Sequence, residues 1–117
     1  MNKVINKITP KKVLQITNIL RSLGLNTSHK GTKIINKVIQ YVIKYDLEFI
    51  TLDTIYKHIS LESGLNINSL RTDVNNALNN RNIQLSKTNF EKIFNYEYYD
   101  KNFEPKVFIE EVSSLLK

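Results

Sequence analysis

The chain has 117 residues and a mass of 13.7 kDa, which is the size of a single domain. Hydrophobic residues make up 41% and charged residues 24% of it, which excludes a wholly disordered chain. Cysteine is absent, so disulfides and thiolate chemistry are excluded. No apolar run approaches the ~18 residues of a membrane span, and the start of the chain lacks the apolar core of a secretory signal, so we expect a cytoplasmic protein. The expected organisation is one domain over residues 1–117, in which residues 1–9 form a flexible N-terminal segment.

Charge is distributed unevenly along the chain. The net charge is +6, and residues 1–45 hold nine basic residues and no acidic residue. The other eight basic residues and all eleven acidic residues lie in 46–117. This asymmetry favours a polyanionic partner, nucleic acid first and an anionic membrane second, and the alternative is a lysine-coated surface without such a partner. The apolar stripe of the first helix is better explained as core than as a membrane-binding face, so we predict no membrane partner.

Six amphipathic helices and no strand are predicted. The first begins at Thr9-Pro10, because proline is tolerated at the first helical position, and it ends at Gly24 in a left-handed cap. A broad apolar face over residues 34–43 predicts the second helix.

A short helix followed by a longer one is predicted in the middle of the chain. The first spans residues 52–61, Gly64 lies in the turn, and the second spans 67–80 with Asn66 or Asn68 as its cap. Two helices joined by a tight, glycine-containing turn are the pattern of a helix-turn-helix, whose second helix enters the major groove of DNA.

The C-terminal part of the chain contains two further predicted helices. The weaker one carries Phe90 and Phe94, residues 95–102 are predicted as a loop, and the last helix runs from Pro105 to Leu116. Three tyrosines of the loop are expected to pack against the core, with a dimer contact as the alternative. These are Tyr96, Tyr98 and Tyr99. The predicted fold class is therefore all-α, a compact bundle of about six helices containing a helix-turn-helix.

The exposed side of the predicted 67–80 helix suits the reading of DNA bases. Asparagine can bond to adenine, arginine to guanine, and hydroxyl groups to several base edges. The predicted base-reading residues are Asn68, Ser69, Arg71, Thr72, Asn75 and Asn76. Other residues are predicted to contact phosphates, which supply most of the affinity. These are Lys30, Lys33, Lys37, Lys57 and His58.

Several short segments match a known pattern in order and spacing. They are Ile16-Thr17-Asn18-Ile19-Leu20, Leu23-Gly24, His29-Lys30-Gly31, Ile55-Tyr56 with Ile59, Leu70, Val74, Ala77 and Leu78, Phe94-Asn95-Tyr96, and Pro105 with Phe108-Ile109. Together they resemble the C-terminal DNA-binding domain of stage zero sporulation protein A, the sporulation transcription factor of bacilli and clostridia, from about Val13 to Leu116. The resemblance implies a six-helix fold with a helix-turn-helix. It also implies binding to a short promoter box, often by two molecules in tandem.

The chain departs from that family at the reading positions. Ser69 stands where the family has an arginine, and Thr72 and Asn75 replace further arginines. Asn76 replaces a histidine, and Arg71 occupies the place of a glutamate. These changes indicate a different target, richer in A·T pairs, or the loss of base reading. The family's receiver domain has no counterpart here, so we expect no control by aspartyl phosphorylation.

We predict a sequence-specific protein that binds double-stranded DNA, as a small transcriptional regulator or an accessory protein that binds as a homodimer or in tandem. The alternative is a protein-interaction module that pairs with or antagonises a full-length sporulation-type regulator without reading DNA. An enzyme is not expected, and neither is a metal or cofactor, because two histidines, no cysteine and three glycines provide neither a metal site nor a phosphate loop. His29 and His58 are expected to be surface or capping residues.

Overall fold

A computed structural model describes residues 7–47 and 51–117, and over these ranges the chain forms an all-α bundle without strands, as predicted. Its elements are α1 (Pro10–Ser22), α2 (Lys30–Lys44), α3 (Leu52–Ser63), α4 (Ile67–Asn79), α5 (Ile83–Phe94), the 3-10 helix η1 (Asp100–Phe103) and α6 (Pro105–Leu116). Of the predicted flexible segment, positions 1–6 lie outside the described residues, and residues 7–9 lead into α1 without regular structure.

The ends of the first helices follow from local sequence. Thr9 caps α1 by accepting a hydrogen bond from a backbone N–H of the first turn (3.1 Å), and Pro10 begins the helix. Gly24 has a φ of +95°, which confirms the predicted left-handed stop after α1. His29 caps α2, because its Nδ1 accepts a hydrogen bond from the Gly31 N–H (2.9 Å). Capping is one of the two roles expected for this histidine.

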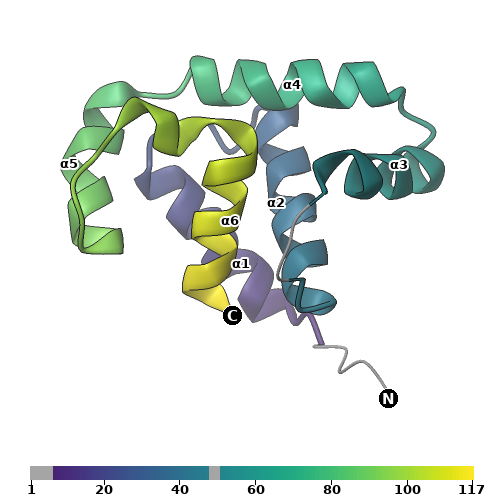
Figure 1. Cartoon of the computed structure of the whole chain (residues 1–117), viewed down its shortest axis with the longest axis horizontal. Coiled ribbons are helices and arrows are strands. Elements are labelled where there is room, and N and C mark those ends of the chain that lie inside the picture. The colour runs from purple at the N-terminus through teal and green to yellow at the C-terminus, as the bar shows by residue number, and fades with distance from the viewer. Residues whose placement is uncertain (1–6, 48–50) are drawn as a thin grey trace.

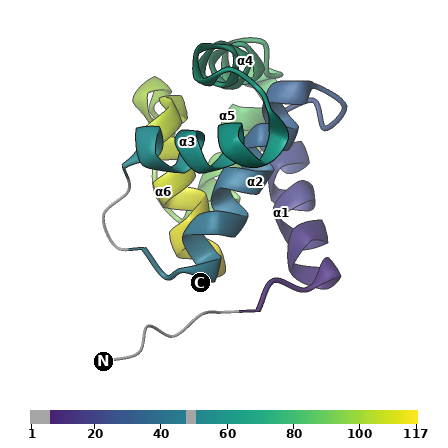
Figure 2. The same ribbon diagram turned by 90° about the vertical axis from the view of Figure 1, so that its right-hand side faces the viewer.

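α2 forms the centre of the molecule, with α1 and α6 on either side of it and α4 across one of its ends (Figures 1 and 2). Its buried apolar residues are Ile34, Ile35, Val38, Ile39, Val42 and Ile43. Full burial of such a side chain contributes about 1.5–3 kcal/mol relative to leaving it exposed, so this face of α2 is a large part of the core. Leu70 and Val74 of α4 and Phe108 and Ile109 of α6 pack into the same core.

The backbones of α2 and α4 come into contact at Gly31. A Cβ atom built on this glycine would lie 1.8 Å from the carbonyl oxygen of Asp73 and 2.8 Å from the Cβ of Ala77. No side chain fits in that space, so the absence of one at Gly31 is what allows the first turn of α2 to touch the middle of α4. This crossing fixes the position of α4 on the core.

The start of α1 is joined to the end of α6. The ammonium group of Lys12 donates a hydrogen bond to the Leu116 carbonyl (3.0 Å). In Figure 1 the start of α1 and the end of α6 lie at the end of the molecule away from α4, near the label of the C-terminus. The first and last helices therefore close the bundle on the side opposite α4.

Arg81 connects the end of α4 with α5 and with the segment that follows α5. Its guanidinium donates hydrogen bonds to the Leu78 carbonyl (2.9 Å) and the Ser86 hydroxyl (3.1 Å). It also donates to the Tyr98 hydroxyl (2.7 Å) and lies over the Phe103 ring, 3.9 Å from its centre. Arg81 was not predicted to have a role, and these contacts make it a structural residue.

The predicted loop over residues 95–102 is partly wrong, because its last residues belong to η1. The side-chain oxygen of Asn102 accepts a hydrogen bond from the Tyr99 N–H (2.9 Å), and the Asn102 N–H donates to the Tyr99 carbonyl (2.9 Å). The two bonds close a 3-10 turn that propensity alone does not indicate.

Aromatic rings from this segment surround Phe90. The ring centres of Tyr96, Tyr98 and Phe103 lie 5.1, 5.9 and 6.0 Å from that of Phe90. The expected packing against the core is confirmed for Tyr98, whereas Tyr96 contacts the Phe90 ring but is 38% exposed. The same expectation is wrong for Tyr99, which is 51% exposed and whose hydroxyl donates a hydrogen bond to Glu97 (3.2 Å).

Candidate nucleic-acid interface

α3 and α4 are joined by residues 64–66 and cross at a steep angle. Figure 2 shows α4 along its axis, whereas α3 lies across the view. Gly64 has a φ of +75° and ends α3, donating its N–H to the Ser60 carbonyl (2.8 Å). Asn66 begins α4, because its side chain accepts a hydrogen bond from the Asn68 N–H (2.8 Å). The pair fits the predicted pattern of two helices joined by a short turn with glycine.

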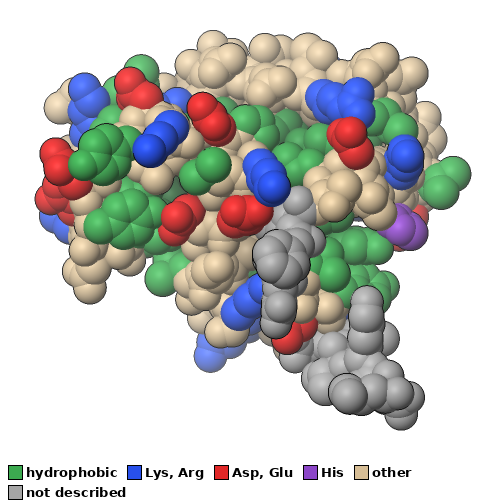
Figure 3. All heavy atoms as spheres, viewed as in Figure 1, with side chains coloured by type: hydrophobic (Ala, Val, Ile, Leu, Met, Phe, Trp, Pro, Cys, Tyr) green, Lys and Arg blue, Asp and Glu red, His purple; other side chains and the backbone are tan. Residues whose placement is uncertain are grey.

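α4 presents a polar face to solvent along its whole length. Its opposite face is apolar and buried, mainly against α2. All six residues predicted to read bases are exposed, namely Asn68, Ser69, Arg71, Thr72, Asn75 and Asn76. Figure 3 shows a band of uncharged surface over α4, where asparagine, serine and threonine side chains project. The face is therefore accessible to a partner and rich in hydrogen-bonding groups.

Arg71 is ion-paired with Asp53 of α3. Its Nε (3.2 Å) and Nη2 (2.7 Å) both donate to one carboxylate oxygen of Asp53, and its Nη1 donates to the Asn68 side chain (3.0 Å). Three of the five guanidinium N–H groups are thus engaged, which leaves one on each terminal nitrogen for a partner. The two side chains of the pair are 43% and 61% exposed, so the pair contributes little to stability. Asp53 was not predicted as part of the site, because it is 18 positions from Arg71 and no spacing rule signals the contact.

Tyr56 is buried beside this ion pair, between α3 and α4. Burial raises the pKa of the Tyr56 hydroxyl to about 12, and the nearby charges of Arg71 and Asp53 act on it in opposite directions, lowering and raising it. Tyr56 is therefore neutral near pH 7, and its ionisation reports on the contact between the two helices.

A groove of about 420 Å³ lies between α2, α3 and the first half of α4. This lysine groove has among its lining residues Lys30, Lys33, Lys37, Ile59, Leu65 and Ser69. Three of the five predicted phosphate contacts therefore lie together, in the same groove as Ser69 of α4. Asp73 is the single acidic residue among the described groove residues and lies 3.6 Å from the ammonium of Lys30. Lys33 and Lys37 form no ion pair with residues 7–47 or 51–117.

The two predicted phosphate contacts on α3 lie outside the lysine groove. Lys57 and His58 are both exposed. The ring of His58 lies 5.4 Å from that of Tyr41, near the end of α2 that points away from α4. The structure therefore does not bring His58 together with the polar face of α4.

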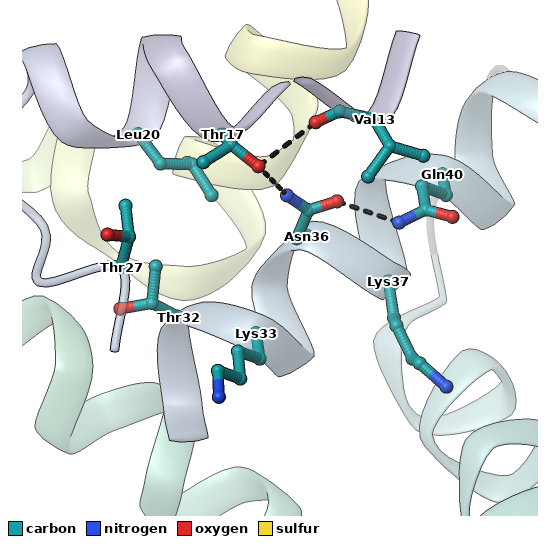
Figure 4. Close-up of a pocket in the computed structure, with 9 residues that line it drawn as sticks. All are labelled: Val13, Thr17, Leu20, Thr27, Thr32, Lys33, Asn36, Lys37 and Gln40. Atoms are coloured by element: carbon teal, nitrogen blue, oxygen red, sulfur yellow. Dashed lines mark hydrogen bonds between the residues drawn. The ribbon is translucent and has the colours of Figure 1, made fainter. Parts of the chain in front are cut away.

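A second pocket, of about 240 Å³, lies between α1 and α2 and also has Lys33 and Lys37 in its lining (Figure 4). Amide and hydroxyl groups bridge the helices beside it. Gln40 donates to the Asn36 side chain (2.7 Å), and Asn36 donates to the Thr17 hydroxyl (3.0 Å). Both lysines thus border two hollows at once, and Figure 4 shows Lys37 extending away from this network.

Comparison of the chain with protein-family models, with curated proteins and with solved structures gives no match. Within the described part of the chain, no helix has the length and apolar character needed to cross a membrane. The same residues contain no group of three or more His, Cys, Asp or Glu that could hold a metal ion. The inference of function therefore depends on the exposed face of α4 and the lysine groove.

Proposed function

We propose that this chain binds double-stranded DNA, with α4 in the major groove and lysines of α2 on the phosphate backbone. The observation that carries the proposal is the exposed face of amide and hydroxyl side chains along α4, placed beside a row of lysines. The resemblance to the DNA-binding domain of the sporulation regulators supports the same function, including the binding of two molecules in tandem.

The base contacts would come from the exposed face of α4, whose first turn follows the short connection after α3. Asn75 and Asn76 supply amides that suit adenine. Arg71 retains two outward donors that suit guanine, and Asp53 holds the other edge of its guanidinium. The proposed target is therefore rich in A·T pairs and contains a guanine.

The lysines of α2 would differ in how strongly they bind phosphate, because they lie at different distances from α4. Lys30 lies next to α4, as its ion pair with Asp73 shows. Lys37 is seven residues farther, or about 10 Å along the helix at 1.5 Å per residue. Lys30 and Lys33 are thus the stronger candidates for phosphate binding, and Lys37 the weaker one.

The proposal is tested by fluorescence anisotropy on three labelled duplexes: the sporulation-family promoter box, an AT-rich random pool and a GC-rich control. Salt is stepped from about 50 to 200 mM, because each phosphate contact contributes roughly 0.9 to the slope of log affinity against log salt. A steep slope with one preferred duplex is the expected result. No binding at about 50 mM salt would contradict the proposal.

Variants separate phosphate contacts from base contacts. Lys30→Ala with Lys33→Ala should weaken all duplexes alike and reduce the salt slope by about 2. The matched control removes the same charge from α5, through Lys87→Ala with Lys92→Ala, and should leave the slope unchanged. If both double variants behave alike, net charge and not the α2 row determines binding.

Sequence preference should depend on Arg71. Arg71→Ala should reduce discrimination at one base pair by about 1–3 kcal/mol. Arg21 is a matched control, because it is an exposed arginine on α1 that also donates to an asparagine side chain (3.2 Å). Arg21→Ala should leave the preferred sequence unchanged. An unaltered preference in Arg71→Ala would show that this face does not read bases.

A second candidate function is a protein-interaction module that pairs with or antagonises a full-length sporulation-type regulator. The observation in its favour is that Arg71, the single arginine or lysine on α4, is ion-paired with Asp53. This candidate predicts co-elution with such a regulator and no duplex binding at about 150 mM salt. DNA binding that persists at this salt, without co-elution, would contradict it.

A further inference from the structure

The lysine groove has an apolar floor that DNA would not use. The floor contains Ile34 and Ile59, which are buried, and Leu65, which is 49% exposed. Lys33 and Lys37 lie along one side of the groove and have no described ion-pair partner. A groove with exposed apolar surface between unpaired cations can take a ligand that is apolar at its centre and acidic at its edges.

We propose that the lysine groove binds an acidic amphipathic helix of a protein partner. Apolar side chains on one face of that helix would cover Leu65 and Ile59, as in other helix-in-groove complexes. Carboxylates beside the apolar face would pair with Lys33 and Lys37. The volume of about 420 Å³ lies within the 300–1,000 Å³ that is typical of ligand pockets, so it suits the anchoring side chains of one helix.

Charge selects the acidic partner over a neutral or basic one. The groove holds three lysines and one aspartate, and that aspartate already faces Lys30. A basic helix would be repelled by Lys33 and Lys37, while a neutral one would leave them unpaired as it covered the floor. A phosphate backbone could pair with the lysines, but it has no apolar groups to cover Leu65.

Binding of the helix does not depend on the proposed DNA function. One consequence of it does, because Lys33 and Ser69 belong both to the groove and to the proposed DNA surface. A helix seated in the groove would therefore compete with duplex DNA. Because the groove and the proposed DNA surface overlap, the helical partner would be an antagonist of DNA binding.

The test uses the whole chain and a fluorescein-labelled helical probe of about 16 residues, with leucines at i, i+4, i+7 and i+11 and glutamates at most other positions. One control peptide replaces the leucines with serines, and another replaces the glutamates with lysines. The expected result is saturable binding of the first peptide alone, with a Kd of about 1–100 µM. In amide NMR spectra the largest shifts should fall at Ile59 and Leu65.

Paired variants locate the binding to the groove. Lys33→Glu with Lys37→Glu, and separately Leu65→Ser, should each raise the Kd at least about tenfold. The control for the charge change is Lys87→Glu with Lys92→Glu on α5. The control for Leu65→Ser is Leu85→Ser on α5, because the Leu85 side chain is similarly exposed, at 43%. They should change the Kd less than about twofold. Far-UV circular dichroism and melting temperatures confirm that each variant is folded.

Three results would overturn the proposal. One is equal binding of the serine peptide, because charge alone would then explain the effect. Another is no saturable binding up to about 1 mM. The third is a wild-type dimer that Lys33→Glu with Lys37→Glu converts to a monomer in sedimentation, because the groove would then hold a second copy of the chain.

Duplex binding is measured separately from peptide binding. Binding of the acidic peptide without any duplex binding would support this inference and contradict the proposed function. Duplex binding without peptide binding would support the proposed function and contradict this inference. If both occur and the peptide displaces the duplex, the competition inferred from the shared residues is established.

Discussion

α4 is held in different ways along its two flanks. Toward α2 the contact is buried and involves the backbone itself, because a Cβ at Gly31 would lie 1.8 Å from the Asp73 carbonyl oxygen. Toward α3 the turn is open, since a Cβ at Gly64 would meet no atom within 4 Å. The polar link on that side is the exposed ion pair of Arg71 with Asp53.

The difference indicates which contact positions the proposed reading face. The α2 crossing places α4 on the core, so changes there should move or release the whole face. The α3 flank contributes polar contacts that can be altered while the fold is retained. Substitutions on the two flanks should therefore separate stability from recognition.

The largest effect is expected from Gly31→Ala. The added methyl group has no room against the backbone of α4, so α2 and α4 must separate and the core beneath them must loosen. We expect a loss of about 3 kcal/mol or more in the free energy of unfolding, measured by urea denaturation followed by circular dichroism. A loss below about 1 kcal/mol would show that the α2–α4 crossing is not a rigid contact.

The next effect concerns the buried hydroxyl of Tyr56 on the α3 flank. Its pKa is raised from 10.0 to about 12, so the unfolded chain loses this proton at lower pH than the folded chain. The folded state should therefore lose stability as the pH rises from about 10 to about 12, by on the order of 2 kcal/mol.

Tyr56→Phe isolates this alkaline effect. The variant should show a smaller alkaline loss than the wild type when urea midpoints at about pH 9 and about pH 11.5 are compared. Tyr96, whose pKa is also raised to about 12, is present in both proteins and cancels in the difference. Equal losses in both proteins would indicate that Tyr56 is accessible to solvent.

A smaller effect is expected at Gly64. Its φ of +75° disfavours a side chain, but nothing obstructs one, so Gly64→Ala should cost about 1 kcal/mol of stability. Gly64→Asn should cost less, because asparagine tolerates this conformation, as Asn95 does at the end of α5 with a φ of 64°. A cost as large as that of Gly31→Ala would mean that the turn is packed.

The smallest stability change is expected for Asp53→Asn, below about 1 kcal/mol, because the ion pair is exposed. The effect of Asp53→Asn on sequence selectivity in DNA binding should be larger than its effect on stability. Loss of the negative charge weakens the hold on Arg71, so selectivity for one base pair should fall while overall affinity stays the same or rises. If selectivity increases, Asp53 restrains Arg71 instead of orienting it.

Helices with a continuous apolar stripe could be predicted from the sequence, and α5 shows why the others are harder. In its first turn Ile83 and Leu85 are exposed, whereas Ser86 is buried and donates its hydroxyl to the Leu23 carbonyl (2.6 Å). The burial pattern there is the reverse of the hydropathy pattern. The local cap is Asn82, whose side chain accepts a hydrogen bond from the Leu85 N–H (3.1 Å), but the burial of Ser86 reflects a contact between residues 63 positions apart, which periodicity does not detect.

The same limit applies to the candidate site. The outward positions of α4 could be predicted, because they are what remains once Leu70, Val74, Ala77 and Leu78 turn inward. Contacts between separate elements could not be predicted from the sequence. The pairing of Asp53 with Arg71, the anchoring of Arg81 and the apolar floor of the lysine groove all depend on how separate helices pack.

The contact between Lys12 and the Leu116 carbonyl has a practical consequence for attachment to other molecules. It keeps the first turn of α1 and the last turn of α6 together, at the end of the bundle opposite α4 (Figure 1). A fluorophore, a surface linker or a fused protein joined beside either helix would extend away from the polar face. The chain can therefore be immobilised or labelled on that side while α4 and the lysine groove stay open to duplexes and peptides.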